Sequence, residues 1–206
     1  MSIVPRRVAG SLRGGLVPIT RGLHALGIRA NTVTVLGFLL TVVGAALLAT
    51  AQPAAALIVL LLGSLCDTLD GQLARASGGG TRFGAFLDST LDRLSDAALA
   101  IAAIQLGATL PDAVLYGGGL VLLVASFLVS YIRAKAESLG ESASIGIAPR
   151  EARIALYLVG VAAWAVTGSS LLFAVAVAVA AFLATVTVIQ RIAHMASALD
   201  EKERLK

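Results

Sequence analysis

The stretch that decides the fold is LCDTLDGQLARASGGGTRFGAFLDSTLDRLSD, residues 65–96, which sets five aspartates among apolar residues. The first two are three residues apart and the last three are spaced by four, namely Asp67, Asp70, Asp88, Asp92 and Asp96. Side chains at these spacings lie on one face of a helix. The glycine-rich turn between the two segments folds the second helix back against the first. We therefore expect the two acidic faces to meet.

The surroundings of this stretch are those of a membrane protein. The chain has 206 residues, of which 58% are hydrophobic and 14% are charged, and its mean hydropathy is +0.91. This composition is too apolar for a soluble domain of that length and predicts an all-α integral membrane protein. Because a carboxylate at membrane depth costs on the order of 2.5 kcal/mol or more, the aspartates should face the interior of the helix bundle.

Six apolar segments approach the length that spans a bilayer. They are residues 31–50, 53–76, 84–106, 111–134, 154–166 and 170–191. The residues before them, 1–30, mix arginines with leucines and valines, which predicts a juxtamembrane amphipathic helix. The sequence thus predicts one domain over 1–206, with a six-helix bundle at 31–195 and a tail at 196–206.

The basic residues predict how the bundle is oriented. If the six helices alternate in direction, all 16 Lys and Arg residues fall on one side. By the positive-inside rule that side is cytoplasmic, so both termini and the acidic cluster should face the cytoplasm from the inner (plasma) membrane. The net charge of +4 suits anchoring to lipid headgroups, and we expect no nucleic-acid partner.

The aspartates also predict a cofactor. Several carboxylates around one cavity repel each other in a low dielectric, and divalent cations are their natural counter-charge. Ligands that are all oxygen favour Mg²⁺ or Mn²⁺ over Zn²⁺, and Mg²⁺ commonly shares its coordination with phosphate oxygens. Gly71 would leave bare backbone beside these aspartates for a ligand, and Arg75 lies one turn further on the same face, where it can bind a phosphate. The alternative is structural pairing of the aspartates with Arg75, Arg82 and Arg93.

The spacing of these residues resembles a known family signature. The pattern is Asp67-x-x-Asp70-Gly71-x-x-Ala74-Arg75, then eight residues, then Gly84-x-x-x-Asp88-x-x-x-Asp92. This resembles the signature of the CDP-alcohol phosphatidyltransferase family. The resemblance implies six transmembrane helices, a site open to the cytoplasm, a homodimer and two bound divalent metal ions.

The resemblance also implies roles for individual residues. The metal ligands would be Asp67, Asp70, Asp88 and Asp92, with Asp92 acting in addition as the general base. The contacts to the cytidine diphosphate of CDP-diacylglycerol would be Gly71 and Arg75, with Asn31, Thr34 and Thr81 as further contacts.

The acceptor alcohol is indicated by a second group of residues. Cations at the predicted cytoplasmic ends, beyond those needed for a pyrophosphate, suit an acceptor that itself carries a phosphate. The segments SYIRAKAESLG (130–140) and REARIALYLVG (150–160) resemble the actinobacterial-type phosphatidylinositol phosphate synthases. That resemblance implies transfer of the phosphatidyl group to inositol 1-phosphate, releasing CMP, with the acceptor phosphate held by Lys135, Arg153 and Arg191.

Other interpretations stay open at this point. The same chemistry could use glycerol 3-phosphate or another alcohol. The basic residues, with Arg133 and Arg150 among them, could instead be ordinary anchors to lipid phosphates. Intramembrane aspartates also occur in divalent-cation transporters. The clustering of the acids at one depth argues against a transport path.

Overall fold

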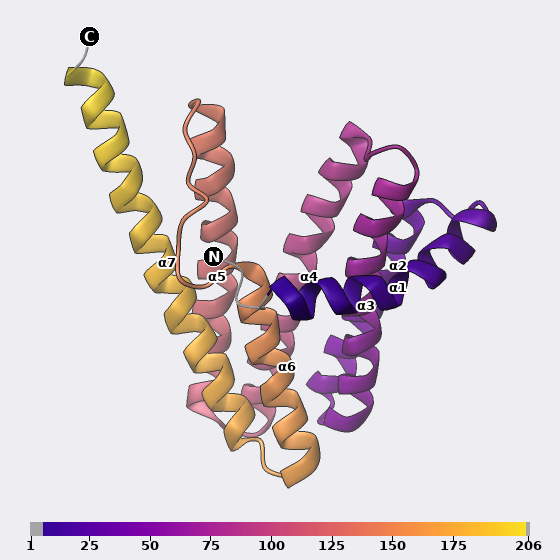
Figure 1. The fold of residues 1–206 in the computed structure, drawn as a ribbon. Coiled ribbons are helices and arrows are strands. Elements are labelled where there is room, and N and C mark those ends of the chain that lie inside the picture. The colour runs from indigo at the N-terminus through magenta and orange to yellow at the C-terminus, as the bar shows by residue number, and fades with distance from the viewer. Residues whose placement is uncertain (1–5, 205–206) are drawn as a thin grey trace.

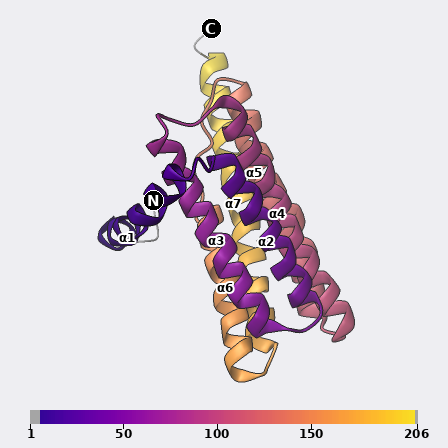
Figure 2. The same ribbon diagram turned by 90° about the vertical axis from the view of Figure 1, so that its right-hand side faces the viewer.

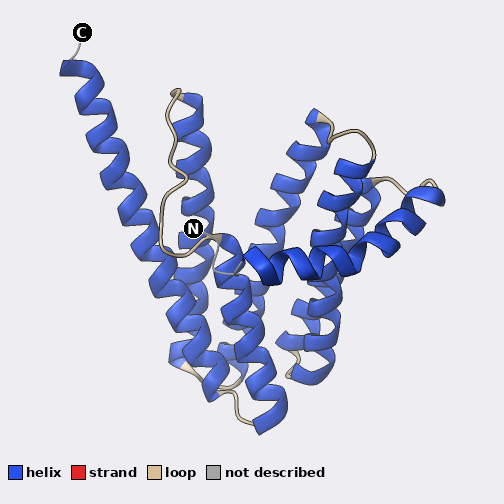
Figure 3. Ribbon diagram, in the orientation of Figure 1, coloured by secondary structure: helices blue, strands red, loops and turns tan. Residues whose placement is uncertain are grey.

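The structure is a computed structural model, and it describes residues 6–204. Within that range it contains seven helices and no strand (Figure 3). The helices are α1 (Arg6–Ala25), α2 (Ala30–Ala49), α3 (Pro53–Ala76), α4 (Arg82–Thr109), α5 (Ala113–Ser138), α6 (Arg150–Thr167) and α7 (Leu171–Arg204). The predicted all-α class is therefore confirmed.

The six apolar segments correspond to α2 through α7, and most helices extend beyond them. The segment predicted at 53–76 coincides with α3, whereas α7 continues through most of the expected tail, as far as Arg204. In the described part of the chain, α2, α3, α5 and the Leu171–Asp200 part of α7 are long and apolar enough to cross a membrane. The charges of the candidate site interrupt the apolar character of α4 and α6.

Helices α2 to α7 stand side by side, and α1 runs crosswise to them on one side, beside α3 (Figures 1 and 2). The connections α1–α2, α3–α4 and α5–α6 are at one end of the bundle, and the other three are at the opposite end (Figure 1). The segment expected as a juxtamembrane helix thus forms α1, although residues 1–5 lie outside the described range. Leu23 of α1 packs beside Leu69 and Leu73 of α3, which ties α1 to the helix that carries the first aspartates.

Two glycines bring α2 and α3 into close contact. A Cβ atom on Gly37 would lie 3.0 Å from the Cβ of Cys66 and 3.3 Å from the carbonyl oxygen of Gly63. A Cβ atom on Gly63 would lie 3.2 Å from the carbonyl oxygen of Gly37. Only small residues permit this approach of two helix backbones. The contact fixes α3 just before Asp67.

The turn between α3 and α4 needs its glycines. Gly78 and Gly79 have φ angles of 89° and 111°, in a region that residues with a Cβ rarely adopt. Thr81 then caps α4, because its hydroxyl accepts a hydrogen bond of 2.9 Å from the backbone N–H of Gly84. The turn therefore starts α4 at a fixed angle to α3.

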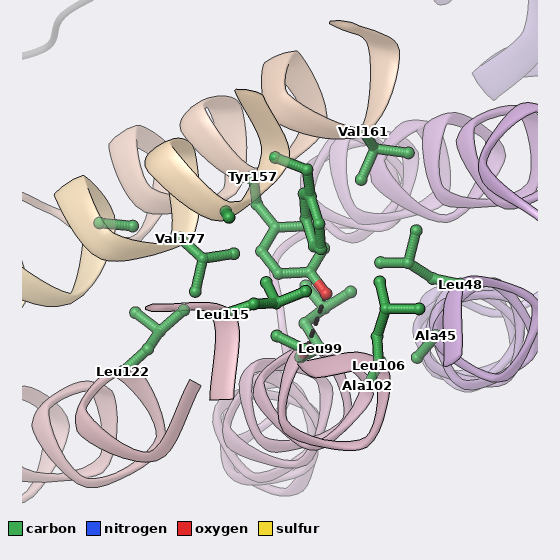
Figure 4. Close-up of a cluster of buried hydrophobic side chains, with 14 of the residues drawn as sticks. Ala45, Leu48, Leu99, Ala102, Leu106, Leu115, Leu122, Tyr157, Val161 and Val177 are labelled. Atoms are coloured by element: carbon green, nitrogen blue, oxygen red, sulfur yellow. Dashed lines mark hydrogen bonds between the residues drawn. The ribbon is translucent and has the colours of Figure 1, made fainter. Parts of the chain in front are cut away.

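The apolar core fixes α6 against α4. Tyr157 of α6 is buried among leucines, valines and alanines of the neighbouring helices (Figure 4). Its hydroxyl donates a hydrogen bond of 2.7 Å to the carbonyl oxygen of Leu99 in α4, and its ring meets Phe173 edge to face at 5.0 Å. A buried tyrosine hydroxyl requires such a partner. The Tyr157–Leu99 hydrogen bond fixes the position of α6 along α4, and with it the place where the first turn of α6 meets the aspartates of α4.

Candidate active site

Three aspartates converge where α3 faces α4. Asp67, Asp88 and Asp92 each place one carboxylate oxygen so that the three oxygens lie within 4.8 Å of one another. The two acidic faces therefore meet as the helical spacing predicts. The structure brings together three of the four predicted metal ligands in one compact group.

Asp70, the fourth predicted ligand, lies three residues further along α3 than Asp67, outside the compact group. It is buried, and its Oδ2 atom has no hydrogen-bond partner among the residues that the structure describes. A buried, unpaired carboxylate oxygen is costly, so it is an unusual feature unless a cation or a ligand binds it. Asp70 lines the same cavity as Asp67 and Asp92, and its unpaired oxygen fits a divalent metal.

Asp67, Asp70 and Asp92 form part of the wall of a cavity of about 510 Å³ between α2, α3, α4 and α6. Its lining includes charged side chains, with Arg150 beside these aspartates, and apolar side chains such as Phe38, Leu60 and Leu158. A cavity that has both charged and apolar walls suits a lipid with a charged headgroup. It is therefore the candidate binding site.

The predicted nucleotide contacts lie around the ends of α2, α3 and α4. The guanidinium of Arg75 folds back over Gly71, where a Cβ atom would be 3.6 Å from Arg75 Nη1. A Cβ atom on Gly84 would be 2.9 Å from the Asn31 Oδ1 atom and 3.1 Å from the Thr81 hydroxyl, so these side chains gather at the start of α4. Thr34 lies further along α2 and lines the cavity itself.

The predicted acceptor contacts are in three different settings. Lys135 is exposed in the last turn of α5. Arg153 is buried and donates to the carbonyl oxygen of Ala148 at 2.9 Å and to Asp96 at 3.1 Å. Arg191 of α7 is also buried and donates to the backbone carbonyl oxygens of Val129 and Ile145. Each of the two arginines thus bonds the α5–α6 connection, and Arg153 also contacts Asp96.

The connection itself, residues 139–149, runs back along α7 before α6 begins (Figures 1 and 3). Side chains on one face of α7 hold it. The backbone N–H of Ala148 donates to the Thr187 hydroxyl at 3.2 Å, and the N–H of Ile147 donates to Gln190 Oε1 at 3.1 Å. His194 lies 3.1 Å from the carbonyl oxygen of Ser142. These bonds hold the loop against α7 along its length. The loop thereby places the first residue of α6 next to the aspartates.

That first residue, Arg150, is the one that sequence reasoning did not place in the site. Its Nη1 atom lies 3.0 Å from Asp92 Oδ1 and 3.4 Å from Asp67 Oδ1, and its Nε atom donates to Asp96 at 3.2 Å. The available signal was the three-residue spacing of Arg150 and Arg153, which puts both on one face of a helix. The path of the loop, which decides what that face meets, leaves no pattern in the sequence.

Comparison with known proteins identifies the group to which the chain belongs. The sequence profile of the family described as CDP-alcohol phosphatidyltransferase matches residues 28–189. The chain is 36% identical over 189 residues to archaetidylinositol phosphate synthase of Pyrococcus horikoshii, covering 90% of this chain and 93% of that protein. It is 39% identical over 145 residues to phosphatidylinositol phosphate synthase of Mycobacterium tuberculosis, covering 69% of this chain and 67% of that protein.

Solved structures of one of these relatives agree with the sequence comparison. The crystal structure of the M. tuberculosis phosphatidylinositol phosphate synthase with CDP-DAG bound matches with a TM-score of 0.79 at 35% identity, over 85% of this chain and 90% of that one. The structure of the same synthase with manganese and citrate matches with a TM-score of 0.77. That manganese agrees with the hard divalent cation predicted from the aspartates. This membrane protein belongs to the CDP-alcohol phosphatidyltransferase family, a family of enzymes of phospholipid biosynthesis.

Proposed function

We propose that the protein transfers the phosphatidyl group of CDP-diacylglycerol to inositol 1-phosphate, giving phosphatidylinositol phosphate and CMP. The observation that carries the proposal is the convergence of Asp67, Asp88 and Asp92, two of which, Asp67 and Asp92, line the cavity. Such a group of carboxylates suits divalent cations, and the apolar remainder of the cavity suits acyl chains.

Asp67, Asp70, Asp88 and Asp92 would hold two divalent ions, Mg²⁺ or Mn²⁺. The unpaired Oδ2 atom of Asp70 and the compact carboxylate group support this assignment. When bound, the ions supply positive charge that offsets the pyrophosphate and the departing CMP. The carboxylates supply oxygen ligands from two helices, which fixes where that charge lies.

The donor headgroup would lie over the start of α4 and the bare backbone at Gly71. Arg75 is folded over Gly71, so its guanidinium is placed to bind a phosphate with more than one donor. Asn31, Thr34 and Thr81 would contact the cytidine or its ribose from the edge of the site. The Thr81 hydroxyl accepts the α4 capping bond, and its own proton is free to be donated to a ligand.

Asp92 would accept the proton of the acceptor alcohol as general base. Its side chain is 20% exposed and lines the cavity. The alcohol oxygen then attacks the phosphorus attached to diacylglycerol, and the bond from that phosphorus to the CMP oxygen breaks. This direct transfer requires no covalent intermediate with the protein.

Lys135, Arg153 and Arg191 would hold the phosphate of the acceptor. Two arginines fixed by carbonyl oxygens beside the loop 139–149 support a rigid anion site. The names of the relatives, archaetidylinositol phosphate synthase and phosphatidylinositol phosphate synthase, favour an inositol phosphate over glycerol 3-phosphate.

We further propose that α2 to α7 all cross the inner (plasma) membrane, with both termini and the active site on the cytoplasmic side and α1 along the membrane surface. The alternating connections in Figure 1 and the single-sided distribution of basic residues support this orientation. By analogy with the family, the working unit would be a homodimer.

One assay tests the acceptor and the orientation together. Inside-out and right-side-out membrane vesicles that contain the protein and CDP-diacylglycerol are given Mg²⁺ with inositol 1-phosphate, glycerol 3-phosphate or inositol, and CMP release is measured. We expect CMP only from inside-out vesicles with inositol 1-phosphate. CMP release with glycerol 3-phosphate instead would show that this alcohol is the acceptor. Release only from right-side-out vesicles would show that the orientation is the reverse of the one proposed. Mg²⁺ uptake without CMP would instead indicate a transporter.

A further inference from the structure

Arg150 occupies the centre of the acidic cluster. One guanidinium at the start of α6 contacts carboxylates from both α3 and α4, at 3.4 Å from Asp67, 3.0 Å from Asp92 and 3.2 Å from Asp96. Its side chain is 24% exposed, so these contacts are partly shielded from water. Two of its three partners, Asp67 and Asp92, belong to the group of oxygens that converge within 4.8 Å.

Asp67 and Asp92 cannot bind a divalent metal ion and the Arg150 guanidinium equally closely at the same time. A divalent metal ion coordinates carboxylate oxygens at about 2.0 to 2.1 Å in the case of Mg²⁺. Held between Asp67 and Asp92, it would lie within a few ångströms of the guanidinium, and like charges at that distance repel strongly in a partly dehydrated site. Binding of the metal must therefore weaken the contacts of Arg150 to these two aspartates.

Asp96, the third partner, offers the Arg150 guanidinium a position away from Asp67 and Asp92. Asp96 lies one turn further along α4, outside the converging group, and Arg153 also holds it at 3.1 Å. The guanidinium can keep its bond to Asp96 while it gives up the other two. The backbone at Arg150 is fixed by the loop on α7, so this movement is confined to the side chain.

We propose that Arg150 is the internal counter-cation of the metal site: it holds Asp67 and Asp92 together when no metal is bound, and the metal displaces it toward Asp96. The inference rests on the proposed function, because it takes these aspartates to be metal ligands. This exchange leaves Asp67 and Asp92 next to a positive charge in both states. By linkage, the factor by which bound metal weakens the contacts of Arg150 to the aspartates is also the factor by which these contacts lower the affinity for the metal.

The test compares the affinity for Mn²⁺, measured by electron paramagnetic resonance titration of the purified full chain at fixed ionic strength. Loss of one competing ion pair predicts that Arg150→Gln binds Mn²⁺ about fivefold more tightly than the wild type, or better. Without metal, the same variant should melt at a lower temperature. Replacing a residue with a purely structural role would lower both the Mn²⁺ affinity and the melting temperature. A higher Mn²⁺ affinity together with a lower melting temperature therefore identifies the counter-cation.

Arg133→Gln is the matched control, because Arg133 is exposed and pairs only with Glu137 among its described neighbours. It removes the same charge and should leave the Mn²⁺ affinity unchanged. Arg150→Lys keeps the charge but loses the fork of donors, and its affinity should lie between those of the wild type and Arg150→Gln. It serves as the test if the glutamine variant does not fold.

The possible results separate two failures. Unchanged or weaker Mn²⁺ binding in the Arg150 variants, or an equal gain in Arg133→Gln, overturns the counter-cation role and leaves the proposed function in place. If the wild type itself does not bind Mn²⁺, or if Asp67→Asn binds it as tightly, the metal site of the proposed function is wrong, and the inference fails with it.

Discussion

Among single residues, Asp92 is the one proposed both as a metal ligand and as the general base. Its carboxylate belongs to the converging group, lies 3.0 Å from Arg150 and faces the cavity. Asp92→Asn keeps the shape of the side chain but removes the charge and the basic oxygen. We expect CMP release to fall by at least about 100-fold, the usual contribution of a general base alone.

The control for this substitution is Asp200→Asn, because Asp200 is an exposed aspartate that pairs with Arg204 on the last turns of α7. It should leave the rate unchanged. Melting temperatures of both variants check that the fold is retained. A well-folded Asp92→Asn protein with nearly wild-type turnover would remove Asp92 from the mechanism.

At the level of elements, the fastening of the loop 139–149 to α7 positions the start of α6. Gly146 has a φ of 127°, and a Cβ atom there would lie 2.3 Å from the Thr187 methyl group. Gly146→Ala should therefore cost about 1 to 3 kcal/mol for the backbone and about 1 to 3 kcal/mol for the overlap. The measurements are the melting temperature and the KM for the acceptor, which should rise as the loop shifts Arg150 and Arg153.

Two variants isolate the contact with α7. Gly140, in the same loop, also has a positive φ of 74° but has open space around its Cβ position, so Gly140→Ala should show the backbone cost alone. Thr187→Ser removes the methyl group and keeps the hydroxyl that binds Ala148. It should restore part of the stability lost in Gly146→Ala. If Gly146→Ala behaves as Gly140→Ala does, the contact does not position the loop.

The elements themselves were largely predictable, and their ends were not. Hydropathy located all six long segments, because burial in lipid or in the core requires a continuous apolar run. The helices continue past those runs because charged residues pair along the helix surface, as Arg133 does with Glu137 and Asp200 with Arg204. Such pairs extend a helix without any apolar signal.

For the whole molecule, the arrangement around α3 and α4 followed from the sequence, whereas the contribution of α6 did not. Helical spacing and a glycine turn were enough to predict that the aspartates of the two helices meet. The position of Arg150 depends on an irregular loop and on side chains about 40 residues later in α7. An irregular segment has no periodicity from which its path could be read. The site is therefore closed by contacts that only the assembled bundle defines.

The central claim is that this bundle holds divalent metal between α3 and α4, and anomalous diffraction from crystals of the full chain grown with Mn²⁺ tests it most directly. The account predicts an anomalous peak at coordination distance from Asp67, Asp88 and Asp92, with the Arg150 guanidinium moved toward Asp96. A cavity without such a peak, with these three carboxylates turned away from one another, would contradict it.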